Sequence, residues 1–203
     1  SKSQEFKWLS VFSDISNDDI VNGLNEFVDS YGSWIELKRK DEKYQGEYSG
    51  IAKQELDKCD EDYLRMKNNI ANFLSGESNK EKLDSFRLMN AAMFMQLWHS
   101  VKAKQDDVNS YINDESFTYF NFNFYKIIAD DKLFSKTESA GWRAFQLAFI
   151  LLNLDGIFKS EDDTNWDKRN NWVDLVWFPT GGGKTEAYLG LIALTIINRR
   201  KEF

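Results

Sequence analysis

The chain has 203 residues, of which 42% are hydrophobic and 15% aromatic, and it carries a formal net charge of −7. So many apolar side chains exclude a disordered chain, and the acidic balance argues against a dedicated nucleic-acid-binding module, because such modules are normally basic. The single cysteine, Cys59, excludes an internal disulfide and is typical of a reducing compartment. The sequence has no signal peptide and no apolar run of the ~18 residues that a membrane span needs. We therefore expect a soluble, cytoplasmic protein with no membrane partner.

Residues 1–135 are predicted to form a helical extension, because apolar residues recur there every three or four positions in three separate stripes. The first stripe comprises Ile20, Leu24, Phe27, Val28, Tyr31, Trp34 and Ile35; the second Ile51, Leu56, Cys59, Tyr63, Met66, Ile70 and Phe73; the third Leu83, Phe86, Met89, Met93, Leu97 and Val101. Asn17 is placed to cap the first helix, and Ser75-Gly76 to end the second. Three long helices with short polar connections suggest a bundle.

A glycine-rich loop near the end of the sequence points to a phosphate-binding site. Residues 178–185 read Phe-Pro-Thr-Gly-Gly-Gly-Lys-Thr and follow an apolar run, Trp172–Trp177, that predicts a strand. Successive glycines let the backbone approach a ligand, and their N–H groups form an anion-binding nest at the start of the following helix. We predict that nucleotide is bound by the set Thr180, Gly181, Gly182, Gly183, Lys184 and Thr185. Lys184 would reach the phosphates and the Thr185 hydroxyl would hold Mg²⁺. The alternative is a glycine-rich turn that binds nothing.

The loop lacks the first glycine of the standard phosphate-loop pattern, since Phe178 stands there, and its Pro-Thr-Gly-x-Gly-Lys-Thr order resembles motif I of superfamily 2 helicases and translocases. Upstream, Arg143 and Gln146 open an apolar run that predicts a buried helix, and they resemble the Arg-x-aromatic-Gln element of the same superfamily. That resemblance implies that Arg143 and Gln146 bind the nucleotide, with the Gln146 amide pairing with adenine. In the alternative, both residues only cap a core helix.

A narrower resemblance covers about the last third of the chain and one island upstream. Residues 145–151 and 174–191 are similar to the helicase subunit of DISARM anti-phage defence systems, and so are residues 86–93 with Gln96. The resemblance implies an ATP-dependent helicase or translocase of bacterial defence, with ATP and Mg²⁺ as cofactors and nucleic acid, most simply DNA, as a partner of the full-length protein.

The predicted fold is mostly α: a helical N-terminal extension, residues 1–135, followed at 136–203 by the beginning (strand, phosphate loop, helix) of a RecA-like α/β ATPase domain. Hydrolysis also needs carboxylates that hold Mg²⁺ and position water, and in helicases these come after motif I. We therefore expect no catalytic residue within these 203 residues, so that the longer parent protein hydrolyses ATP and this chain by itself does not. An alternative function is a helical interaction module that docks a partner subunit of a defence complex, with the phosphate loop at its edge.

Overall fold

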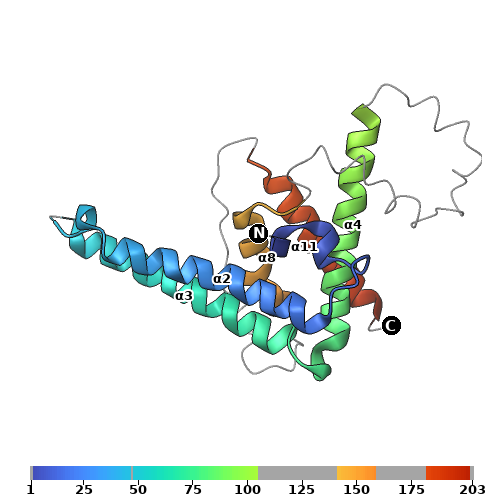
Figure 1. The fold of residues 1–203 in the computed structure, drawn as a ribbon, viewed down its shortest axis with the longest axis horizontal. Helices are drawn as coiled ribbons and strands as arrows, with labels where there is room; N and C mark the ends of the chain where they lie inside the picture. Colours follow the sequence, from blue (N-terminus) through green and yellow to red (C-terminus); the bar gives the residue numbers. More distant parts are fainter. Residues whose placement is uncertain (1, 47, 105–140, 159–181, 202–203) are drawn as a thin grey trace, which may run out of the picture.

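The computed structural model describes residues 2–46, 48–104, 141–158 and 182–201 (Figure 1). These residues are mostly helical, and the β-type pairing found among them is one isolated antiparallel bridge between Glu5 and Gly141. The expectation of a mostly α protein is confirmed for these ranges. The strand predicted over Trp172–Trp177 lies outside them, so the RecA-like beginning stays a prediction.

Helices of very different length make up the described ranges. The α-helices are α1 (Phe6–Leu9), α2 (Asn17–Arg39), α3 (Ser49–Phe73), α4 (Lys80–Lys104), α8 (Ala144–Leu152), α9 (Leu154–Phe158) and α11 (Lys184–Lys201). Short 3-10 turns, η1 (Lys2–Gln4), η2 (Glu42–Tyr44) and η3 (Glu77–Asn79), begin the chain and join α2 to α3 and α3 to α4.

The three helices expected from the apolar stripes are α2, α3 and α4, and one predicted cap is wrong by a residue. Ser16, not Asn17, caps α2: its Oγ accepts the N–H of Asp19 at 3.1 Å. Asn17 instead turns its Oδ1 to Nη1 of Arg87 on α4, at 2.8 Å. Gly76, in the left-handed region at φ 80°, follows α3 close to the end predicted for that helix.

Arg87 fastens the loop between α1 and α2 to α4. Its Nη2 donates to the backbone carbonyls of Ser10 and Ser13, both at 3.0 Å, in addition to the contact with Asn17. Burial lowers the pKa of the Arg87 guanidinium, and the carboxylate of Asp84 opposes that effect. Arginine side chains stay protonated in proteins, so the carbonyls of the loop between α1 and α2 are held by a permanent positive charge.

Helices α2 and α3 lie side by side as an arm that projects from the rest of the molecule (Figure 1). Near its far end the two helices are joined by ion pairs from Arg39 to Asp57, at 2.7 Å, and to Asp60. Large apolar side chains are exposed in this part of the arm. They are Trp34, Leu37, Tyr48 and Ile51. Two of these residues, Trp34 and Ile51, belong to the predicted apolar stripes, and Leu37 and Tyr48 do not.

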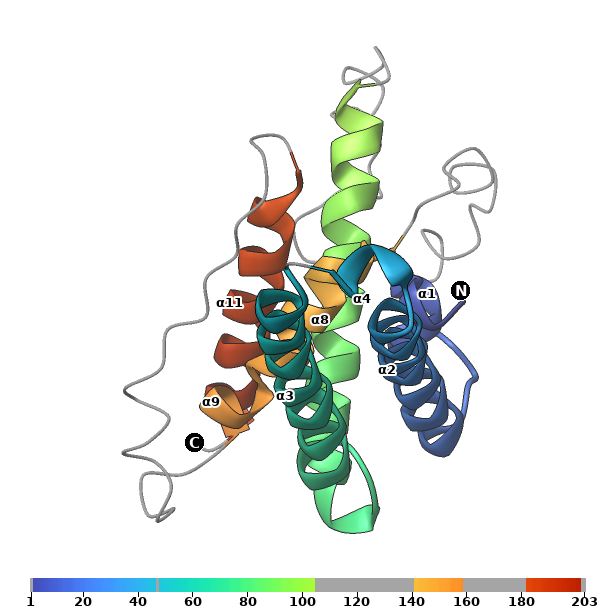
Figure 2. The same cartoon turned by 90° about the vertical axis from the view of Figure 1, so that its left-hand side faces the viewer.

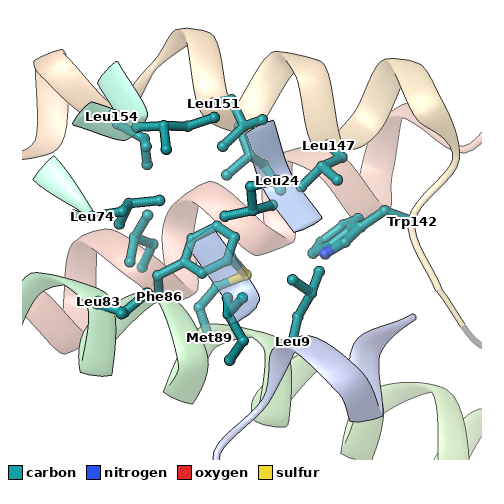
Figure 3. Close-up of a cluster of buried hydrophobic side chains, with 14 of the residues drawn as sticks. Leu9, Leu24, Leu74, Leu83, Phe86, Met89, Trp142, Leu147, Leu151 and Leu154 are labelled. Atoms are coloured by element: carbon teal, nitrogen blue, oxygen red, sulfur yellow. The ribbon is translucent and has the colours of Figure 1, made fainter. Parts of the chain in front are cut away.

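The core forms where the base of the arm meets the remaining helices. Helix α8 packs on α3 and α11, and α11 packs on α4 (Figure 2). Leu147 and Leu151 of α8 face Leu24 of α2 and Phe86 of α4, all fully buried (Figure 3). Helices on both sides of the predicted boundary at 135/136, which itself lies outside the described ranges, thus share one hydrophobic cluster.

A buried side-chain amide on α3, one of the two helices of the arm, caps the C-terminus of helix α8. The Nδ2 of Asn69, on α3, donates to the carbonyl oxygens of Leu151 at 2.8 Å and Leu152 at 3.2 Å. The last carbonyls of a helix have no partner within it, so a side chain from a neighbouring helix can satisfy them. Asn69 thereby joins the arm to the end of α8 opposite the glycine loop.

Asn69→Ala is expected to lower the free energy of unfolding by about 1–3 kcal/mol, because it leaves the α8 carbonyls buried without their donor. Urea denaturation measures the change. Asn68→Ala is the matched control, since Asn68 is the adjacent residue on the same helix and is exposed. Equal stability of the two variants would contradict the capping role.

Candidate functional site

The structure describes part of the predicted nucleotide site. Gly182, Gly183, Lys184 and Thr185 are described at the beginning of α11, and Arg143 and Gln146 at the beginning of α8. Thr180 and Gly181 lie outside the described residues, as does the polar segment 160–171. Six of the predicted site residues therefore lie within the described ranges.

Gly183 adopts a backbone conformation that few other residue types tolerate. Its φ is 84°, in the left-handed region, and Lys184 begins α11 immediately afterwards. A Cβ at Gly183 would lie 2.7 Å from Nε2 of Gln146 and 3.2 Å from a carboxylate oxygen of Glu186. Both the backbone angle and the lack of space therefore require glycine here.

Arg143 and Gln146 converge on the glycine loop, although 37 to 39 positions separate them from it in sequence. The Nε2 of Gln146 donates to the carbonyl of Gly183 at 2.6 Å, and Nη1 of Arg143 donates to the carbonyl of Gly182 at 3.0 Å. The Gln146 side chain is 4% exposed, whereas Arg143 is exposed. Arg143 and Gln146, which the sequence predicts to bind nucleotide, thus contact two of the predicted loop residues, Gly182 and Gly183.

Gln146 also caps α8. Its Oε1 accepts the backbone N–H of Arg143 at 2.8 Å, and its own backbone N–H donates to the Arg143 carbonyl at 2.9 Å. This is the helix-capping role that the alternative interpretation assigned to it, found together with the loop contact. These contacts use one lone pair of Oε1 and one N–H of Nε2, and adenine recognition stays a prediction.

The start of α11 carries the groups expected to hold phosphate and magnesium. Its N-terminus has the positive end of the helix dipole, Lys184 is its first residue, and Thr185 is exposed beside it. A hydroxyl is an oxygen ligand of the kind Mg²⁺ prefers, and Mg²⁺ commonly takes one or two protein oxygens together with substrate phosphate and water. Thr185 fits that role. Within the described ranges no three His, Cys, Asp or Glu side chains gather into a metal-binding group.

Trp142 and Gly190 pack together beside the candidate site, and the sequence interpretation did not single out either residue. The indole of Trp142 is 3% exposed and its Nε1 donates to Oδ1 of Asn90 at 2.7 Å. On α11, a Cβ at Gly190 would lie 2.7 Å from Cη2 of Trp142 and 3.1 Å from Cδ1 of Ile150. Gly190 therefore lets α11 approach α8 closely. The available signal was Asn90, which lies in the upstream island that resembles the same proteins.

None of the described helices is both long and apolar enough to span a bilayer. No protein-family model matches the chain. A comparison with curated proteins finds similarity to DISARM protein DrmA of Bacillus paralicheniformis, with 33% identity over 184 residues. The match covers 90% of this chain but 14% of DrmA, so the chain spans only a small part of that relative's length. It includes most of the helical extension as well as the region of the glycine loop, given its extent of 184 residues.

Proposed function

We propose that this chain is the nucleotide-binding front part of a longer ATP-driven DNA helicase or translocase that acts in bacterial anti-phage defence. The observation that carries the proposal is the convergence of Arg143 and Gln146 on the carbonyls of Gly182 and Gly183, directly before α11. These two donors fix the backbone of the loop at the point where α11 begins and where phosphate would bind. Similarity to a DISARM protein supports the defence context.

Each described residue has a role in this proposal. The N-terminus of α11 receives the phosphates, and Lys184 adds a positive charge at the transferred phosphoryl group. Thr185 holds Mg²⁺, which neutralises charge on the β- and γ-phosphates when it is bound. Gln146 contacts the adenine edge, and Arg143 lies at the rim of the loop. Carboxylates that complete hydrolysis would come from the longer protein.

The arm favours a second function, docking of a partner subunit in a defence complex. Its far end exposes Leu37, Tyr48 and Ile51, each more than half accessible to solvent. Exposed apolar side chains gathered on one projecting element often mark an interaction site. The two functions are compatible, and they separate experimentally because only the first requires ATP turnover.

The proposed function is tested by purifying the longer protein and measuring phosphate release from Mg²⁺-ATP, with and without single-stranded and duplex DNA. We expect turnover that DNA stimulates, and displacement of a third strand from a triplex as the protein moves. The 203-residue chain is the matched control and should release phosphate at the background rate. If the longer protein shows no turnover under any of these conditions, the helicase proposal fails and the docking function remains.

Gln146→Ala is expected to reduce the preference for ATP over GTP in the longer protein. A site that hydrogen-bonds a base loses discrimination when its polar partner is removed, by about 1–3 kcal/mol. Arg143→Ala should lower the use of both nucleotides, because the loss of its bond to Gly182 affects the loop and not base choice. The ratio of kcat/KM for ATP and GTP measures the effect. An unchanged ratio in Gln146→Ala, together with a lower melting temperature, would leave helix capping as the role of Gln146.

A further inference from the structure

Gln4 lies far from the glycine loop in sequence, but it forms hydrogen bonds to both the N–H and the carbonyl of Trp142, the residue before Arg143. Its backbone carbonyl accepts the N–H of Trp142 at 2.8 Å, and its side-chain Nε2 donates to the carbonyl of Trp142 at 3.1 Å. The neighbouring bridge from Glu5 to Gly141 brings the two segments together. A Cβ at Gly141 would overlap the Gln4 carbonyl, so the close approach requires glycine at that position.

The Trp142–Arg143 peptide group therefore has partners on both sides. Its oxygen accepts from Gln4 Nε2, and its N–H donates to Oε1 of Gln146 at 2.8 Å. The same Gln146 amide donates through Nε2 to the Gly183 carbonyl at 2.6 Å. Three amide groups (the Gln4 side chain, the peptide and the Gln146 side chain) are thus joined head to tail and end at the glycine loop.

The direction of this amide chain follows from its partners. The Arg143 N–H can only donate and the Gly183 carbonyl can only accept, so Gln146 must turn its oxygen to the first and its nitrogen to the second. The Trp142 carbonyl likewise requires the nitrogen of Gln4. Amides joined in this way polarise one another, so a donor at one end strengthens the bond at the other.

We propose that Gln4 is a positioning residue for the glycine loop, acting through the Trp142–Arg143 peptide and Gln146. The effect on ATP rests on the proposed function, whereas the effect on the loop does not. The hydrogen bonds of Gln4 described above go to Trp142, so its effect on Gly183 is indirect. Its role is to hold the donor and acceptor of Gln146 in the orientation that fixes the Gly183 carbonyl and the start of α11.

The test is amide hydrogen exchange of the 203-residue chain without nucleotide. Gln4→Met keeps the length of the side chain but has no N–H donor, and Gln4→Glu is a second isosteric variant without one. We expect exchange to rise roughly threefold to tenfold at Arg143, whose N–H donates to Gln146, and at residues 187 and 188, the first amides of α11 with a partner inside the helix; this is the effect of losing one hydrogen bond. Gln45→Met is the matched control, because Gln45 Nε2 donates to the Arg39 carbonyl at 2.8 Å on the arm. Exchange at these amides that matches the wild type, or matches the control variant, would overturn the proposal.

A double-mutant cycle shows whether Gln4 acts through Gln146 or only stabilises the N-terminus. In a Gln146→Met background, Gln4→Met should add nothing to the exchange of residues 187 and 188. Additive effects would overturn the relay. In the longer protein, Gln4→Met should raise the KM for ATP about threefold to tenfold with kcat little changed. If the wild type neither binds nor hydrolyses ATP, the proposed function fails, and the exchange measurements still decide the role of Gln4.

Discussion

Lys184→Ala should reduce ATP hydrolysis by the longer protein to the background rate. Lys184 is the first residue of α11 and follows Gly183, whose left-handed backbone turns the chain into that helix. A lysine at this place offsets the negative charge of the transferring phosphoryl group, where preorganised positive charge acts most strongly on the rate. The measurement is steady-state phosphate release at saturating Mg²⁺-ATP.

Lys201→Ala is the matched control for this prediction. Lys201 ends the same helix and donates from Nζ to the Glu81 carbonyl at 3.0 Å, so the variant removes a lysine from α11 without touching the loop. Its turnover should stay close to that of the wild type. If Lys184→Ala hydrolyses ATP at the wild-type rate, the nucleotide site is refuted. Equal losses of turnover in both variants would indicate that the substitutions damage α11.

Trp142→Ala should lower the free energy of unfolding by about 3–5 kcal/mol, the cost typical of removing a large buried aromatic side chain. Trp142 is 3% exposed, packs edge-on against Phe6 with ring centroids 4.8 Å apart, and contacts Gly190. Its loss also leaves Oδ1 of Asn90 without the indole donor, which adds to the cost. Urea denaturation of the 203-residue chain measures the difference.

Trp142→Phe should fall between the wild type and the alanine variant, because it keeps an aromatic ring but removes the N–H that bonds Asn90. The matched control is Trp34→Ala on the arm, where the indole is 45% exposed and stacks on Tyr31. That variant should cost clearly less than Trp142→Ala, since almost half of the Trp34 side chain is already exposed to water. Similar losses in Trp142→Ala and Trp34→Ala would contradict the view that Trp142 is a central core residue.

The helices of the arm and the core were predictable because a helical apolar stripe is a local property. The spacing of Ile20, Leu24 and Val28 indicates one face of a helix, and all three are fully buried. The stripes also include Trp34 and Ile51, which are exposed, whereas Ile35, the residue after Trp34, is fully buried. Periodicity indicates the apolar face of a helix but does not determine which residues at its edge or its end are covered by a neighbouring helix.

The candidate site was predictable in its parts and not in its assembly. The Gly-Gly-Gly-Lys-Thr order indicates a phosphate loop because few residues other than glycine tolerate the left-handed backbone of Gly183, and that requirement is local. The contacts from Arg143 and Gln146 to this loop depend on how α8 packs against α11. Sequence interpretation set helix capping against adenine recognition, and the loop contact was part of neither; the Gln146 amide makes the cap and the loop contact together because it has both a donor and an acceptor.

The sequence by itself determined the long helices and the glycine loop, since helix periodicity and backbone freedom act over a few neighbouring residues. Only the tertiary structure decided that Gln4 brackets Trp142, that Asn90 binds its indole and that Gly190 makes room for it. The first of these contacts joins residues 138 positions apart and the second joins residues 52 positions apart. Hydrogen bonds and close packing at such separations depend on the relative placement of whole helices, which the burial of their shared apolar faces sets and no local pattern encodes.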